Sequence, residues 1–494
     1  MKILKSTPVF LFLLPLFFCI HGTVENYDYI YFKEIARVGF AILIGITVFY
    51  LVTKFFVKDT IHAALITFFI CIWILFFGAI FDFVRGIKFI SFLHSYTVFV
   101  PFMLCAFIGF VFFIRKKIAL QKTLCYYLNI LLLLYCLYDF ASLIFISSKP
   151  NKQFAATAIN FDSTLVKAKP NVYFMIFDEY PGYKSLKDSF AFANDSLYNF
   201  LEHKDFKILP TFSNYNMTFY SMASMLNMHY IDKPFIPLQN TFNDDQDRIK
   251  EVKNAQAIQY FESMGYSFTN YSIFDILDQP SIKGNSFVVS QATLLTHKIF
   301  FNRMIKDIGW HFIKGKNKIS FIENIYMKDK RNNAFIEKQL LETNPVKGSP
   351  HFIYAHFNMP HVPFFYDSIG NPLSNATIFD ESLHGDKSLT LSYLKYVNIK
   401  IINLVDVISQ KDSNAIIIVM SDHGWRGYNT GGVITSLYFD NICAVRFPNH
   451  NYLPMEENWS NVNFFRYLFN AQFNQNIPYL KDSSIFLRDL KIAQ

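Results

Sequence analysis

The chain has 494 residues, enough for one large folded domain and a membrane part. Hydrophobic residues make up 52% of it and aromatic residues 18%, which is too apolar for an ordinary soluble protein. The formal net charge of +8 does not indicate a nucleic-acid partner. Lys and Arg cluster beside the hydrophobic segments, so membrane topology explains part of the excess.

Five hydrophobic runs dominate the first 150 residues, and most approach the ~20 residues that a helix needs to cross hydrocarbon. They lie at roughly 7–22, 37–57, 60–82, 90–114 and 123–147. We therefore predict an all-α transmembrane anchor of about five helices over residues 1–150. The first run is short, follows Lys2 and Lys5, and contains Pro15, so a signal peptide is the alternative reading.

The charges that flank these runs predict which side of the membrane the rest of the chain faces. A dense positive set falls on one side: Lys2, Lys5, Lys54, Lys58, Arg115, Lys116, Lys117 and Lys122. Dense positive charge marks the cytoplasmic side, so everything after Ser147 is expected outside, whether or not the first run is cleaved. We expect a multi-pass protein of the cell (inner or plasma) membrane. Few ionisable groups interrupt the runs, which favours an anchor over a transporter.

Residues 151–170 are predicted to form a linker, and residues 171–494 a folded domain. Three continuous apolar runs read as buried parallel strands, at 172–177, 352–357 and 415–420. Helical spacing occurs between them, at 186–203, 246–264 and 387–410. This alternation predicts an α/β domain with a mostly parallel sheet covered by helices on both faces.

Two further features of this domain are visible in the sequence. The stretch 280–345 is rich in Lys and Asn and is read as a helical or irregular insertion. Only Cys443 lies after residue 150, so no disulfide framework can form within the domain. An ordinary hydrophobic core must therefore hold it together.

Polar side chains follow each predicted strand. The first strand ends in Asp178-Glu179, and the third is followed by Ser421-Asp422-His423-Gly424. The middle strand leads to His356 and then to Pro360-His361. In open α/β sheets ligands bind beyond the carboxyl ends of the strands, and carboxylates with imidazoles suit zinc or manganese. A single strand-end Asp is more often a helix cap or a turn residue, but three such ends in one chain favour a metal site.

Thr218 stands where a helical pattern begins. An N-cap threonine is common and needs no chemistry, and for this residue alone that reading is favoured. The same position also suits catalysis, because a helix N-terminus attracts a phosphate-like anion. A hydroxyl there, bound to a divalent cation, would lose its proton readily and attack phosphorus.

The order of these motifs resembles the alkaline phosphatase superfamily, in its sulfatase-like branch with the lipoteichoic acid synthases and phosphoethanolamine transferases. The matching pieces are NVYFMIFDEY (171–180), SNYNMTFYSMASMLN (213–227), HFNMPHVPF (356–364) and IIIVMSDHGWRGY (416–428). They cover the chain from 171 to about 450, and hydrophobic helices precede the domain in the membrane members too.

The resemblance implies one divalent cation, zinc or manganese with magnesium or calcium as alternatives, held by Asp178, Thr218, Asp422 and His423. Thr218 would also be the nucleophile, and His361 would contact the substrate phosphate or protonate the leaving oxygen. By position, three side chains would lie at the pocket mouth and bind substrate: Asn358, Trp425 and Arg426.

The chain also departs from the family pattern. Formylglycine sulfatases need Cys or Ser at the nucleophile, followed by Pro and Arg, and residues 218–222 supply none of these, so ordinary sulfate-ester hydrolysis is disfavoured. Phosphoethanolamine transferases typically carry disulfides in the soluble domain, which this chain cannot form. Asp380 and His384 have a suggestive spacing for a second metal, but their context does not match.

The expected function is a two-step phosphoryl-group transfer through a phosphothreonine. The donor would be a membrane lipid, and the acceptor an envelope glycan or lipid. One rival is a hydrolase with the same site and water as the acceptor, either a phosphodiesterase or an unusual sulfatase. A second rival is a non-catalytic envelope scaffold that keeps the fold.

Overall fold

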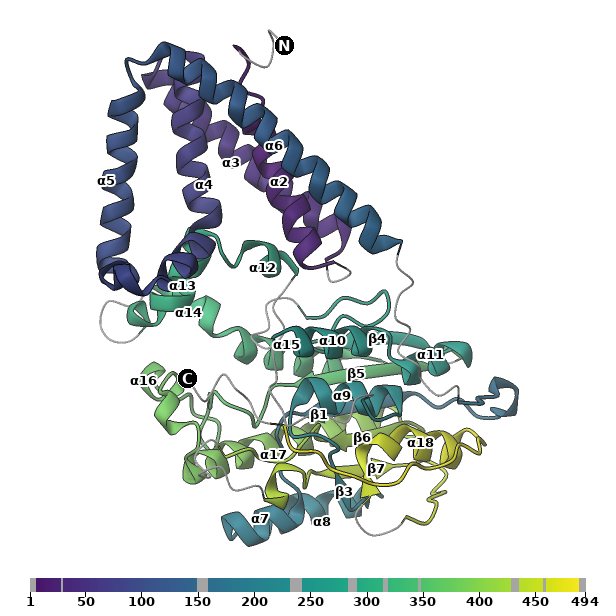
Figure 1. The fold of residues 1–494 in the computed structure, drawn as a ribbon. Helices are drawn as coiled ribbons and strands as arrows, with labels where there is room; N and C mark the ends of the chain where they lie inside the picture. Colours follow the sequence, from purple (N-terminus) through teal and green to yellow (C-terminus); the bar gives the residue numbers. More distant parts are fainter. Residues whose placement is uncertain are drawn as a thin grey trace. The chain divides into compact units, whose positions relative to one another are not determined.

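A computed structural model describes residues 6–27, 30–148, 159–231, 242–282, 291–313, 319–344, 348–427, 435–455 and 459–487. The chain forms two compact units (Figure 1). The first, here the helical unit, comprises residues 1–151 and 289–313. The second, here the α/β unit, comprises residues 152–288 and 314–494.

Each of the five hydrophobic runs forms a helix of the helical unit, as expected. These are α2 (Phe10–Glu25), α3 (Phe32–Phe56), α4 (Thr60–Arg85), α5 (Tyr96–Ile114) and α6 (Ile118–Ser147). The last four are long and apolar enough to cross a membrane, whereas α2 has only 16 residues. The run expected from residue 90 begins instead with a separate 3-10 helix, η1 (Lys88–His94).

Helices α2 and α6 run side by side in the same direction. Near the start of α2, the amide nitrogen of Asn129 donates to the carbonyl of Thr7 over 2.8 Å. Towards its end, Nδ1 of His21 lies 3.1 Å from a carboxylate oxygen of Asp139. The first residues of both helices therefore lie at the same end of the unit.

A segment from much later in the chain completes the helical unit. It contains α12 (Gln291–Thr296), α13 (Phe300–Ile308) and η3 (Gly309–Phe312). The backbone of Gly78 in α4 donates to the carbonyl of Lys298 over 2.7 Å, and a Cβ at residue 78 would lie only 2.9 Å from Cα of Lys298. Glycine is therefore needed at this contact. Most of the described part of the expected insertion, 280–345, is helical.

The α/β unit is built on a six-stranded sheet with the order β2-β7-β6-β1-β5-β4. Its strands are β1 (Val172–Phe177), β2 (Lys207–Ile208), β4 (Ser267–Tyr271), β5 (His351–Phe357), β6 (Ile416–Met420) and β7 (Cys443–Arg446). Strand β1 pairs in parallel with both β5 and β6, and β4 pairs in parallel with β5. Only the β6–β7 and β7–β2 pairs are antiparallel, so the prediction of a mostly parallel sheet is confirmed.

Helices cover both faces of this sheet. Successive side chains of a strand point to opposite faces, so each strand contributes to the core on both sides. Phe174 of β1 belongs to the core on one face, and Met175 to the core on the other. The first core includes residues of α9 (Thr218–Asn227), α10 (Phe242–Lys253), α11 (Gln256–Ser263) and α18 (Phe464–Gln472). The second includes residues of α7 (Tyr183–Phe190), α8 (Asp195–His203), α15 (Lys328–Glu342) and α17 (Lys387–Lys411).

The remaining elements are short. They are η2 (Ser163–Leu165), α14 (Ser320–Tyr326), α16 (Asn375–Ile378), η4 (Glu381–Leu383), η5 (Ser436–Tyr438), η6 (Asn461–Asn463) and the small parallel pair β3 (Thr211–Phe212) and β8 (Trp459–Ser460). Of the expected linker, residues 151–158 lie outside the described residues. Within the rest of it, Phe161 stacks on Tyr260 with ring centroids 4.3 Å apart, so this part of the chain is packed into the α/β unit.

Candidate metal centre and active site

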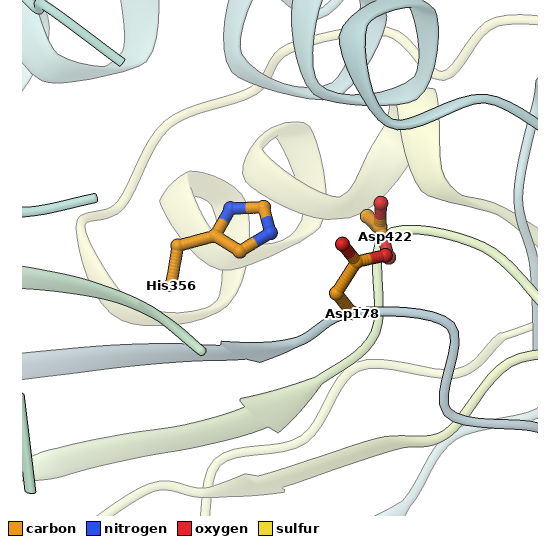
Figure 2. Close-up of side chains that lie close together, drawn as sticks. All are labelled: Asp178, His356 and Asp422. Atoms are coloured by element: carbon orange, nitrogen blue, oxygen red, sulfur yellow. The ribbon is translucent and has the colours of Figure 1, made fainter. Parts of the chain in front are cut away.

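Three neighbouring strands bring a carboxylate, an imidazole and a second carboxylate together. Asp178 directly follows β1, His356 is the penultimate residue of β5, and Asp422 follows β6. Because β1 lies between β5 and β6, these ends meet at one edge of the sheet. One ligand atom of each residue lies within 4.8 Å of the others (Figure 2).

His423 connects this group to Thr218. Its Nε2 lies 3.3 Å from the hydroxyl of Thr218, 3.4 Å from Oδ2 of Asp422 and 3.8 Å from Oδ1 of Asp178. Ligands arranged tetrahedrally at 2.0–2.1 Å from a zinc ion lie about 3.3 Å from one another. Nε2 of His423 therefore lies at distances from the other three expected ligands that fit a shared cation.

The ring of His423 is held with Nε2 towards these groups. Its Nδ1 lies 2.8 Å from the carbonyl of Gly424, so Nδ1 carries the proton and Nε2 presents its lone pair. A Cβ at residue 424 would lie 2.2 Å from the carbonyl oxygen of Leu437. Only glycine fits there, which explains the Gly that follows the Asp-His pair.

The two carboxylates need a positive partner. Asp178 and Asp422 are fully buried. Among the described residues, neither oxygen of Asp178 has a hydrogen-bond partner, and nor does Oδ2 of Asp422. Burial, together with the charge of Asp422, raises the pKa of Asp178 well above its usual value. A divalent cation would satisfy these oxygens, so the residues present fit the expected ion.

Thr218 is the first residue of helix α9 rather than its cap. The residue before it, Met217, occupies the N-cap position and makes no side-chain capping bond. The hydroxyl of Thr218 faces His423 instead, and its side chain is 5% exposed. One turn further on, the hydroxyl of Ser221 donates to the carbonyl of Asp422 over 2.5 Å. This bond ties the start of α9 to the loop that carries two of the proposed ligands.

A second polar cluster lies beside the metal ligands. Oε1 of Glu179 accepts from the backbone nitrogen of Arg426 over 2.6 Å and from its Nε over 3.4 Å. A terminal nitrogen of Arg426 lies 2.6 Å from Nε2 of His361, and Nδ1 of His361 lies 2.6 Å from the carbonyl of Val362. Nδ1 of His361 therefore carries the proton, and Nε2 accepts from the guanidinium.

The charges of this cluster follow from its contacts. Burial raises the pKa of Glu179, but the charge of the Arg426 guanidinium and the hydrogen bond from the Arg426 backbone lower it, and the net result is a pKa below its usual value. Burial lowers the pKa of His361 to about 4, so this imidazole is neutral near neutral pH. Glu179 was visible in the sequence as a strand-end residue, but nothing there indicated that it holds Arg426.

The other expected binding residues differ in their surroundings. Both side-chain polar atoms of Asn358 are buried without a hydrogen-bond partner among the described residues, which is compatible with a role in binding a ligand. Trp425 is 6% exposed, and its ring packs against Phe190 with centroids 5.0 Å apart. Its part in substrate binding stays a prediction. Within the described residues, the one cluster suited to a metal does not include Asp380 or His384.

Comparisons with known proteins place the chain in a family. The profile of the sulfatase family matches residues 193–467, more than half of the chain. No curated protein matches it.

Several solved structures are similar at low identity. The zinc complex of the C-terminal periplasmic domain of EcEptC from Escherichia coli is 10% identical, with 66% of this chain and 91% of that chain covered and a TM-score of 0.39. The lipooligosaccharide phosphoethanolamine transferase EptA from Neisseria meningitidis is 10% identical, with 96% and 95% covered and a TM-score of 0.35. The phosphonate monoester hydrolase SpPMH from Silicibacter pomeroyi is 14% identical, with 64% and 75% covered and a TM-score of 0.37.

Because these TM-scores are low, the solved structures support no functional assignment, and the assignment to a family rests on the family profile alone. The matched range includes Thr218, His361, Asp422 and His423, and the fold brings Asp178, which precedes that range, to the same edge of the sheet. The chain, an enzyme with apolar N-terminal helices, belongs to the sulfatase family.

Proposed function

We propose that this protein is a membrane-anchored, metal-dependent phosphoryl-group transferase that uses Thr218 as its nucleophile. Its substrates would be phosphodiesters of envelope lipids or glycans. One observation carries the proposal: the hydroxyl of Thr218 lies 3.3 Å from Nε2 of His423, beside the two buried carboxylates. The complete set of ligands also argues against a non-catalytic scaffold.

The reaction would proceed in two displacements. When bound, a divalent cation would supply positive charge that lowers the proton affinity of the Thr218 hydroxyl and polarises the phosphoryl oxygens. In the first step Oγ1 of Thr218 loses its proton and bonds to phosphorus, the bond from phosphorus to the leaving oxygen breaks, and that oxygen takes up a proton to leave as an alcohol. In the second step the acceptor hydroxyl bonds to phosphorus and loses its proton, the bond to Oγ1 breaks, and Thr218 regains its proton.

Arg426 would hold the phosphoryl group during both steps. Its guanidinium can pair with two oxygens of a phosphate, and Glu179 holds Arg426 through one contact to its backbone nitrogen and one to its Nε. The positive end of the α9 helix dipole also lies at Thr218. Because Nε2 of His361 accepts from Arg426, the geometry favours a role for His361 in holding Arg426, which would in turn bind the phosphate, over a role as proton donor.

The membrane orientation that we propose places the α/β unit on the extracytoplasmic side of the membrane. Lys116 and Lys117 precede α6, at the end of the helical unit where α2 also begins. At the opposite end, Lys298 lies 3.6 Å from Glu25, near the end of α2. Lys298 belongs to the chain after Ser147. If the end of the helical unit that carries Lys116 and Lys117 faces the cytoplasm, the part of the chain that follows Ser147 lies on the extracytoplasmic side.

Mass spectrometry of the protein purified from its native membrane tests the covalent step. We expect an adduct on the peptide that contains Thr218, with a mass that identifies the transferred group. An unmodified peptide under conditions where substrate turns over slowly would count against the threonine intermediate. Product analysis with and without an added glycan acceptor then separates a transferase from a hydrolase, in which water takes the place of the acceptor.

A further inference from the structure

We propose that His356 is the ligand of a second cation position, which shares Asp178 and Asp422 with the position at Thr218 and His423. This inference rests on the metal site of the proposed function. It concerns how many ions the site holds and leaves open which group is transferred. His356 begins one of the quoted family segments, 356–364, but the expected four-ligand set does not include it.

His356 has an unpaired nitrogen in a buried place. Its side chain is 1% exposed, and Nε2 has no hydrogen-bond partner among the described residues. The ring points towards the carboxylates of Asp178 and Asp422 (Figure 2). A polar atom buried in this way is normally satisfied by a protein group, a water molecule or an ion.

The spacing of these three groups suits an ion between them. Their ligand atoms lie within 4.8 Å of one another, yet Nε2 of His356 makes no hydrogen bond to either carboxylate. A cation bound by two ligands at ordinary bond lengths holds them roughly 3 to 4.5 Å apart. The three groups thus lie close enough to share an ion.

Asp178 is placed to bridge two ions. It follows the central strand β1, with His356 on neighbouring β5 and with Asp422 and His423 after neighbouring β6. Both carboxylate oxygens of Asp178 lack hydrogen-bond partners among the described residues, and Oδ1 lies 3.8 Å from Nε2 of His423. One oxygen is therefore available to each cation position, as in carboxylate-bridged pairs of ions.

Tyr354 would be the positioning residue for His356. The two side chains lie on the same face of β5, two residues apart, and the hydroxyl of Tyr354 lies 2.8 Å from Nδ1 of His356. Tyr354 is fully buried, and its ring packs against Phe174 with centroids 5.2 Å apart. A hydrogen bond to the far nitrogen of an imidazole is the usual way in which proteins orient a histidine ligand.

Metal stoichiometry of the full-length protein in detergent tests the inference. The protein is stripped with a chelator, titrated with Zn²⁺ or Mn²⁺, and assayed by calorimetry and elemental analysis. We expect two ions per chain for the natural protein and one for His356→Ala. The matched control is His351→Ala, at the opposite end of the same strand, which should bind two. We expect Tyr354→Phe to weaken the second ion by about tenfold.

The outcomes separate this inference from the proposed function. A single ion whose binding is unchanged by His356→Ala refutes the second position but leaves the metal-dependent function intact. A single ion bound more weakly by His356→Ala makes His356 a ligand of the first ion and also refutes the second position. If the natural protein binds no ion, both proposals fail. Circular dichroism of each variant shows whether a lost ion reflects lost folding.

Discussion

Oγ1 of Thr218 lies 3.3 Å from Nε2 of His423, although 205 positions separate the two residues in the chain. The contact depends on the bond from Ser221 to the carbonyl of Asp422, which fixes the start of α9 against the loop after β6. It places a hydroxyl at the first residue of a helix next to an imidazole lone pair.

Replacing Thr218 by valine should abolish turnover while leaving the fold intact. Valine has almost the same shape as threonine but lacks the nucleophilic oxygen, so we expect kcat to fall at least about 1000-fold. The control is Thr390→Val, which removes another buried hydroxyl from the first turns of a helix, α17. Steady-state kinetics of both variants make the measurement. Full activity in Thr218→Val would rule out the covalent route.

Weakening the hold on Arg426 should impair substrate binding and catalysis. Glu179→Gln removes the charge that pairs with Arg426, and we expect kcat/KM to fall about 10- to 100-fold, the usual effect of losing a hydrogen bond to a charged group. Glu337→Gln is the control, because Glu337 pairs with Lys400 on the surface of α17 and not with Arg426. Equal losses in both variants would show a general effect on stability.

In the metal-free protein Asp178 should contribute stability at mildly acidic pH that is lost at neutral pH. The pKa of Asp178 is raised in the folded state by burial and by Asp422, so the folded protein holds this proton more tightly than the unfolded one. The contribution of Asp178 to stability therefore falls as pH rises from its unfolded-state pKa through its higher folded-state pKa. Asp178→Asn, which cannot ionise, should lose this component.

Thermal unfolding in chelator at about pH 5 and about pH 7 measures this effect. Adding Zn²⁺ or Mn²⁺ at neutral pH should raise the unfolding temperature of the natural protein and have little effect on Asp178→Asn. The account of Asp178 fails if the two proteins show the same pH profile.

The segment 289–313 should loosen when Arg303 is lost. A terminal nitrogen of Arg303 lies 2.8 Å from a carboxylate oxygen of Asp82 in α4, and its Nε lies 2.8 Å from Asp307. Asp82 is half exposed, so we expect a loss of only about 1 kcal/mol, or roughly a fivefold faster hydrogen exchange in α13 for Arg303→Ala. Lys306→Ala, an exposed change in the same helix, should leave the exchange rate unchanged.

Cysteine labelling tests the proposed membrane orientation. In a chain with Cys105→Ser, a membrane-impermeant maleimide applied to intact cells should label Ser374→Cys and not Lys117→Cys. The first position is exposed in the α/β unit, and the second lies in the positive turn before α6. Labelling of residue 117 alone would place the α/β unit in the cytoplasm.

Much of the architecture follows from local patterns in the sequence. The apolar run 172–177 became β1 with the same bounds, and the helix expected at 387–410 is α17, Lys387–Lys411. A central strand that is buried on both faces needs a continuous apolar run, and a long helix needs apolar residues at regular helical spacing. Both patterns can therefore be recognised in a short stretch of sequence. The polar residues after each strand likewise marked the edge of the sheet where the candidate site lies.

Other features depend on contacts between distant parts of the chain. The helix expected at 186–203 is broken into α7 and α8, with left-handed backbone at Ala191 and Asn194. The expected strands did not include β4 and β7, which are held by pairing with β5 and β6. These outcomes depend on what each segment packs against, which local spacing does not specify.

The same holds for the site. Spacing along the chain indicated which residue types could bind a metal, but not that Glu179 holds Arg426 or that the unpaired nitrogen of His356 faces Asp178. Residue type and periodicity are local properties, whereas the meeting of side chains is set by strand order and packing across the whole unit.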